Sequence, residues 1–248
     1  MYANDAEYFA DIAKAYREEL RVLYEAGCRN VQFDDPNMAC SSPFPLPPSP
    51  HRQGTSDHLT NSTRADFCSP EMLKGFKDAG EDSDALLDAY IKLYNDCLSE
   101  RPKDMHAGIH LCRGNWIHGQ HFAHGAYDVI AKKLFQNLNV DTYYLEYDTE
   151  RAGGFEPLQY LPAHKNVIVG VVSSKKAELE DVEQMKTRVR EAAEWVKKGE
   201  GKGMENLGVS PQCGFASHEV GNDVSRDEMV EKLKLVRKIA DELWPGEK

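Results

Sequence analysis

His110 and Cys112 stand two residues apart in the run MHAGIHLC and offer an imidazole nitrogen and a thiolate sulfur. On a β-strand, residues i and i+2 point to the same face, so these two side chains could hold one metal ion. Glu146 in DTYYLEY adds a carboxylate, and Cys213 after NLGVSP adds a second thiolate. Zinc accepts all of these ligand types, in a closed tetrahedral site or with one position open to a substrate.

A lone His-x-Cys pair is weak evidence for a metal, because a buried cysteine usually behaves as a small hydrophobic residue. The placement of the polar residues favours a site. Five strand-like runs are each followed or closed by polar or thiol groups. The run 30–35 closes with Asp34 and Asp35, the run 105–112 with His110 and Cys112, and the run 141–147 with Glu146 near its end. Ser173 and Ser174 follow the run 166–172, and Cys213 follows the run 206–211. Polar groups at the carboxyl ends of parallel strands are typical of the active site of an α/β barrel.

The bulk composition is that of a globular enzyme. The chain has 248 residues, of which 41% are hydrophobic and 29% charged, so we expect one catalytic domain over residues 1–248. A net charge of −11 argues against nucleic acid or an anionic membrane as partner. The six cysteines show no disulfide-like spacing, and the first residues lack the features of a signal peptide. We therefore expect a cytoplasmic protein.

Helical periodicity alternates with the strand-like runs. We expect helices over residues 5–26, ending at Gly27, over 84–100 with Ser83 as N-cap, and over 178–198. Ser225 and Glu228 form a predicted capping box for the last helix. Alternating strands and helices predict an α/β fold of the (β/α)8 TIM-barrel type.

Two features depart from a complete barrel. About five strand–helix units are recognisable where a closed barrel has eight, so we expect an incomplete barrel whose missing units would precede residue 1 and whose apolar inner face is exposed. Residues 40–65 are rich in Pro, Ser and Thr without a hydrophobic period. We expect them to form a disordered insertion, with a polyproline II recognition segment as the alternative.

The runs QFDDP, IHLCRGN, YYLEYDTERAG and VSPQCGF resemble, in order and spacing, the carboxy-terminal catalytic barrel of cobalamin-independent methionine synthase. That barrel belongs to the methionine-synthase-like and uroporphyrinogen decarboxylase-like superfamily. The resemblance covers most of the chain apart from residues 40–65. It implies that zinc is the cofactor, with His110, Cys112, Glu146 and Cys213 as ligands. It also implies that Asp34 binds the amino group of homocysteine.

The implied activity is transfer of the N5 methyl group of 5-methyltetrahydrofolate, as its polyglutamate, to the homocysteine thiol, which gives methionine. The partners are then small molecules. A zinc-bound thiol is deprotonated at neutral pH, and a general acid is expected to protonate the folate nitrogen. The family carries this acid as a His shortly after the strand aligned with residues 166–172. This chain instead has Ser173, Ser174 and Lys175 there, and His118, His121 and His124 are nearby candidates, so the catalytic acid is not assigned.

Two alternatives stay open. The first is a zinc-dependent thiol alkyltransferase with another donor, as in the related epoxyalkane–coenzyme M transferases and corrinoid-protein methyltransferases. The second is a truncated, non-catalytic remnant that binds zinc or nothing.

Overall fold

The centre of the molecule is a sheet of five parallel strands. The computed structural model of the chain describes residues 2–35, 67–68, 70–80, 82–115, 125–217 and 219–247. Within them the strands lie side by side in chain order: β1 (Asn30–Asp35), β2 (His106–Leu111), β3 (Thr142–Glu146), β4 (Asn166–Val172) and β5 (Leu207–Pro211). Every neighbouring pair is parallel. The predicted α/β fold with about five strand–helix units of barrel type is confirmed, since sequential parallel pairing is the arrangement of a (β/α)8 sheet.

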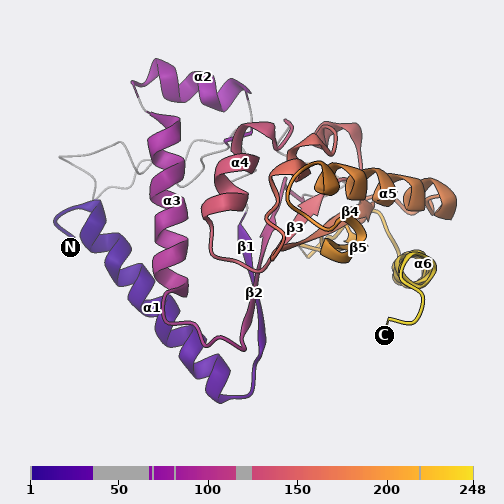
Figure 1. Cartoon of the computed structure of the whole chain (residues 1–248), viewed down its shortest axis with the longest axis horizontal. Helices are drawn as coiled ribbons and strands as arrows, with labels where there is room; N and C mark the ends of the chain where they lie inside the picture. The colour runs from indigo at the N-terminus through magenta and orange to yellow at the C-terminus, as the bar shows by residue number, and fades with distance from the viewer. Residues whose placement is uncertain are drawn as a thin grey trace.

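Helices connect these strands. They are α1 (Asp5–Glu25), α2 (Pro70–Asp78), α3 (Ser83–Leu98), α4 (Asp128–Asn137), α5 (Val182–Lys198) and α6 (Arg226–Leu243), with 3-10 turns η3 (Glu150–Ala152), η4 (Glu156–Tyr160) and η5 (Gly203–Asn206). Figure 1 shows α1 and α3 side by side at the β1 end of the sheet and α6 at the β5 end. No helix in the described part of the chain combines the length and apolarity needed to span a membrane.

Capping side chains determine where the helices begin. α1 starts after Asn4, whose side chain accepts a hydrogen bond from the Glu7 amide. α6 has the predicted capping box, in which Ser225 and Glu228 each accept the other's backbone N–H. The predicted N-cap of α3 is one residue off, because Asp82 rather than Ser83 accepts from the first-turn amides. A carboxylate accepts such bonds more strongly than a hydroxyl because it carries the charge that the helix N-terminus favours.

The two faces of the sheet differ in polarity because successive strand residues point to opposite sides. One set is apolar and buried in the core with helix side chains: Ile109, Leu111, Tyr143, Leu145, Val167 and Val169. The other set, on β1, β2 and β3, is polar: Gln32, Asp34, His106, His110, Thr142, Tyr144 and Glu146. This polar set lies on the face away from the helices, which is the inner face. The prediction of an apolar inner face is therefore wrong for β1, β2 and β3.

Some predictions fall on other parts of the chain. The insertion expected at residues 40–65 lies outside the described residues, as do His118, His121 and His124. α2 was not predicted from the hydrophobic pattern. It is a short helix that begins at Pro70, a residue well suited to a first helical turn.

Candidate metal centre

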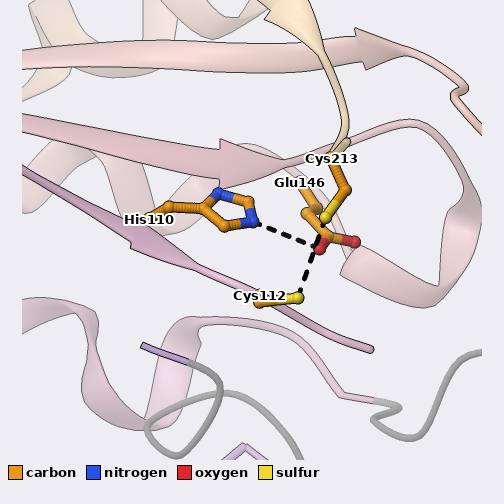
Figure 2. A group of neighbouring side chains, drawn as sticks. All are labelled: His110, Cys112, Glu146 and Cys213. Carbon is orange, nitrogen blue, oxygen red and sulfur yellow. Dashed lines mark hydrogen bonds and ion pairs between the residues drawn. The ribbon is translucent and has the colours of Figure 1, made fainter. Parts of the chain in front are cut away.

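Four side chains converge at the carboxyl end of the sheet. His110 lies on β2 and Cys112 directly after it, Glu146 closes β3, and Cys213 follows β5. One ligand atom of each lies within 4.8 Å of all the others. Figure 2 shows the four side chains pointing toward one another. The structure thus brings together the four residues that the sequence singled out, although Cys213 is 101 residues from Cys112. The parallel order of the strands is what places their ends at one edge.

The two sulfur atoms have the separation that a shared zinc ion requires. Cys112 Sγ and Cys213 Sγ are 3.8 Å apart. Two thiolates bound tetrahedrally at a Zn–S distance of about 2.3 Å lie about 3.8 Å from each other. The pair is therefore spaced for joint coordination without further movement.

The imidazole of His110 is oriented for coordination through Nε2. Its Nδ1 lies 3.2 Å from the main-chain oxygen of Tyr144. Because a carbonyl oxygen only accepts, Nδ1 carries a proton, so in the neutral ring Nε2 presents a lone pair. Nε2 is buried, lies 3.7 Å from a Glu146 carboxylate oxygen and has no hydrogen-bond partner among the described residues. A buried acceptor without a partner is costly, and a metal ion would satisfy it.

Glu146 is fully buried, yet both of its carboxylate oxygens accept hydrogen bonds. The main-chain amide of Arg113 donates to Oε1 at 2.8 Å. The side-chain amide of Gln212 donates to Oε2 at 3.1 Å. Two such bonds favour the ionised carboxylate and fix its plane, as is usual around metal ligands.

The acidic groups of the cluster disturb one another's ionisation. The pKa of the Cys213 thiol is raised by its hydrogen bond to Cys112, by burial and by the negative charge of Glu146. Burial lowers the pKa of His110, but Cys112, Glu146 and Asp34 outweigh it, so the pKa is raised overall. A bound divalent cation would reverse this balance, because it favours thiolates and neutral imidazole.

Asp34 lies beside the cluster. It is in register with His110 across β1 and β2, so the two side chains share the inner face of the sheet. Burial raises the pKa of Asp34 and the charge of Cys112 adds to this, while His110 opposes it. Asp35 points the other way and accepts a 2.6 Å hydrogen bond from the Tyr94 hydroxyl. Of the acidic pair, Asp34 is thus the more exposed residue and the one on the same face as the cluster.

The loop after β4 also reaches the site. Ser173, Ser174 and Lys175 are all buried, and the Lys175 ammonium donates to the Gly114 carbonyl at 2.5 Å. Ser174 contacts Gln212, which precedes the ligand candidate Cys213. This loop is therefore packed against the segments that follow β2 and β5.

Sequence reasoning missed three residues that support the cluster: Arg113, Tyr127 and Gln212. The Arg113 guanidinium is buried 4.1 Å from the ring centre of Tyr127, whose hydroxyl oxygen accepts from the Glu146 amide at 3.1 Å. Arg113 and Gln212 each adjoin a candidate ligand in the runs HLCRG and SPQCG, and that adjacency was the available signal. Nothing in the sequence pointed to Tyr127.

Comparison with known proteins shows which family the chain resembles. Residues 117–242 match the family model described as cobalamin-independent synthase, catalytic domain. The uncharacterized Bacillus subtilis (strain 168) proteins YxjG and YxjH are 35% and 32% identical to the chain over 245 residues. These alignments include 98% of this chain and 56% of each relative, so the chain spans about half the length of the curated relatives it matches.

Solved structures show the same fold. A candidate vitamin-B12-independent methionine synthase from Listeria monocytogenes superposes with a TM-score of 0.66 at 27% identity, over 98% of this chain and 57% of that one. A B12-independent methionine synthase from Shewanella sp. W3-18-1, solved with selenomethionine, gives a TM-score of 0.60 at 19% identity, over 94% of this chain and 54% of that one. At 19% identity the second likeness concerns the fold alone.

Proposed function

Because the chain belongs to the cobalamin-independent synthase catalytic-domain family, we propose that it is a zinc-dependent methyltransferase acting on the thiol of homocysteine. The methyl donor in this proposal is 5-methyltetrahydrofolate, as its polyglutamate, and the product is methionine. The observation that carries the proposal is the convergence of an imidazole, two thiols and a carboxylate within 4.8 Å at the carboxyl end of a parallel sheet.

In this proposal His110, Cys112, Glu146 and Cys213 hold the ion. Zinc bound there would keep an incoming substrate thiol ionised at neutral pH. The chain's part is to arrange the donors. The Tyr144 carbonyl selects the His110 tautomer with a free Nε2, and hydrogen bonds to both oxygens of Glu146 orient its carboxylate.

Asp34 would bind the ammonium group of the amino-acid substrate. Its carboxylate lies on the same face as His110 and is more exposed than the four cluster residues. A substrate whose thiol is held at the cluster would therefore find the Asp34 carboxylate beside it as an acceptor for its amino group. A charge-assisted hydrogen bond of this kind orients a substrate as well as holding it.

One observation favours a second candidate. The position at which the resemblance expects a proton-donating His carries Ser173, Ser174 and Lys175. A donor whose leaving group needs no protonated folate nitrogen would not require that His. A zinc-dependent thiol alkyltransferase with a different donor is therefore the alternative, and it uses the same cluster and the same thiol activation.

Purified protein tests both candidates. Zinc content and homocysteine binding are measured first, and methyl transfer is then assayed with methyltetrahydrofolate polyglutamate and with other alkyl donors. We expect about one zinc per chain, loss of zinc in Cys213→Ala, and retention in Cys97→Ala, which removes a buried thiol on α3 instead. Zinc with turnover only from another donor would favour the alternative. A folded chain without zinc or thiol binding would reject both and leave the non-catalytic remnant.

A further inference from the structure

We infer that Gln212 is a positioning residue that sets the orientation of the Glu146 carboxylate, and that Ser174 in turn fixes Gln212. This inference deepens the proposed metal site and rests on it. It assigns a role to the residue preceding Cys213 that neither composition nor motif spacing indicated.

The side-chain amide of Gln212 is held at both ends. Its Nε2 donates to Glu146 Oε2 at 3.1 Å. Its Oε1 accepts from the Ser174 amide at 3.4 Å and from the Ser174 hydroxyl at 3.3 Å. The orientation of the amide is determined by these partners, because an ionised carboxylate can only accept and a main-chain N–H can only donate. If the side-chain amide were reversed, its oxygen would face the Glu146 carboxylate and its NH2 group would face the Ser174 N–H, and neither pair could form a hydrogen bond.

The backbone is shaped to bring Gln212 to this point. The register between β4 and β5 shifts between Gly170 and Val172. The main-chain N–H of Gln212 donates to the Val172 carbonyl at 2.8 Å. A Cβ at position 170 would lie only 2.8 Å from the Gln212 Cα. The glycine and the irregularity together let the chain after β5 approach β4 closely, as β-bulges commonly do beside functional sites.

Gln212 is also a donor to this carboxylate that side-chain substitution can remove. The other described hydrogen bond, to Oε1, comes from the main-chain N–H of Arg113, which side-chain substitution leaves in place. Gln212 is 2% exposed, so water does not readily substitute for its amide. Removing the Gln212 donor should take away the hydrogen bond at Oε2 and let the carboxylate plane of Glu146 turn relative to His110 and the two sulfurs.

The inference is tested on the full chain by substituting Gln212 and measuring metal binding directly. Gln212→Met keeps the side-chain length and removes all three of these side-chain hydrogen bonds, whereas Gln212→Ala also opens a cavity. Zinc affinity is measured by chelator competition, and the Co²⁺-loaded protein is examined by absorption spectroscopy. We expect both variants to bind zinc about 10- to 100-fold more weakly. We also expect retained sulfur-to-cobalt charge-transfer bands and altered d–d bands, because the thiolates stay and the carboxylate moves.

Asn206→Ala is the matched control. Asn206 precedes β5, is 4% exposed and donates from its side-chain amide to the Ala163 and Lys165 carbonyls. Its loss should lower the unfolding midpoint while leaving zinc affinity and the cobalt spectrum unchanged. Ser174→Ala should weaken zinc binding in the same direction as the Gln212 variants but less.

The outcomes separate the two levels of the proposal. Wild-type protein that binds zinc, with Gln212→Met unchanged in affinity and spectrum, would overturn the role of Gln212 and leave the metal site standing. Equal losses in Gln212→Met and Asn206→Ala would show a general effect of destabilisation and also overturn it. Wild-type protein without zinc affinity would overturn the site and the inference together.

Discussion

Replacing Gly170 by alanine should damage both the stability of the chain and its metal binding. An alanine Cβ at this position would meet three main-chain atoms: Gln212 Cα at 2.8 Å, the Pro211 carbonyl oxygen at 3.0 Å and the Leu145 carbonyl oxygen at 3.1 Å. These atoms belong to the strands or strand ends on both sides of β4. Movement away from one side therefore increases the overlap with the other.

The required movement sets the magnitude. Ordinary contact begins at 3.4 Å, so Gln212 Cα must retreat by 3.4 − 2.8, or 0.6 Å. Such overpacking typically costs about 1–3 kcal/mol of the free energy of unfolding. Metal–ligand distances in a well-formed site lie within about 0.2 Å of their ordinary values. Because Cys213 directly follows Gln212, we expect zinc affinity to fall by about tenfold or more.

Urea unfolding of the zinc-free protein measures the first effect, and chelator competition measures the second. Gly75→Ala is the control, because a Cβ there meets nothing within 4 Å and the residue lies inside α2. That variant should be neutral or more stable by about 0.5–1 kcal/mol, with unchanged zinc affinity. If Gly170→Ala behaves like Gly75→Ala in both measurements, the close approach of β5 to β4 does not constrain the site.

Three further predictions concern single residues. Asp34→Asn should weaken binding of homocysteine about 5- to 30-fold by calorimetry through loss of a charge-assisted hydrogen bond, with zinc content unchanged; parallel loss of zinc would assign Asp34 a structural role. Lys232→Met should lower the free energy of unfolding by about 2–3 kcal/mol, because it leaves the carboxylate of Glu180 without its cation. The Lys232 side chain is fully buried and lies 3.0 Å from Glu180, whose side chain is 19% exposed. An unchanged urea midpoint would contradict this. Burial lowers the pKa of Lys165 to about 8. Between about pH 8 and the ordinary lysine pKa of about 10.4, the unfolded chain therefore binds more protons than the folded chain. The free energy of unfolding should rise with pH across that window by about 2 kcal/mol after discounting for screening. Lys165→Met should lack this rise, and a wild-type curve parallel to that of the variant would refute the assignment.

The strands and the candidate ligands could be predicted because their signals are local. Each of the five strands falls within a predicted run, and alternation along β2 places His110 and Cys112 near one another. Parallel order then requires the strand ends to meet, which brings Glu146 and Cys213 to the same edge. The role of these residues as zinc ligands stays a prediction.

The remaining features depend on relations between distant segments. Gln212 meets Glu146 only because the register shifts between β4 and β5, and no local pattern encodes that shift. The prediction of an apolar inner face is wrong for β1, β2 and β3. Here a local pattern does carry the information, because polar residues recur at every second position of these strands.

If the proposed metal site is right, the order of the strands along the chain would decide when metal can be captured during synthesis. His110, Cys112 and Glu146 are made before Cys213, which follows β5, the last strand of the described sheet. A nascent chain that has emerged only as far as α5 offers one thiolate of the pair and lacks Gln212, the donor to Glu146. A ligand stabilises only the conformations that bind it. Zinc would therefore favour chains in which β5 has already docked, and half-assembled chains would gain little from it.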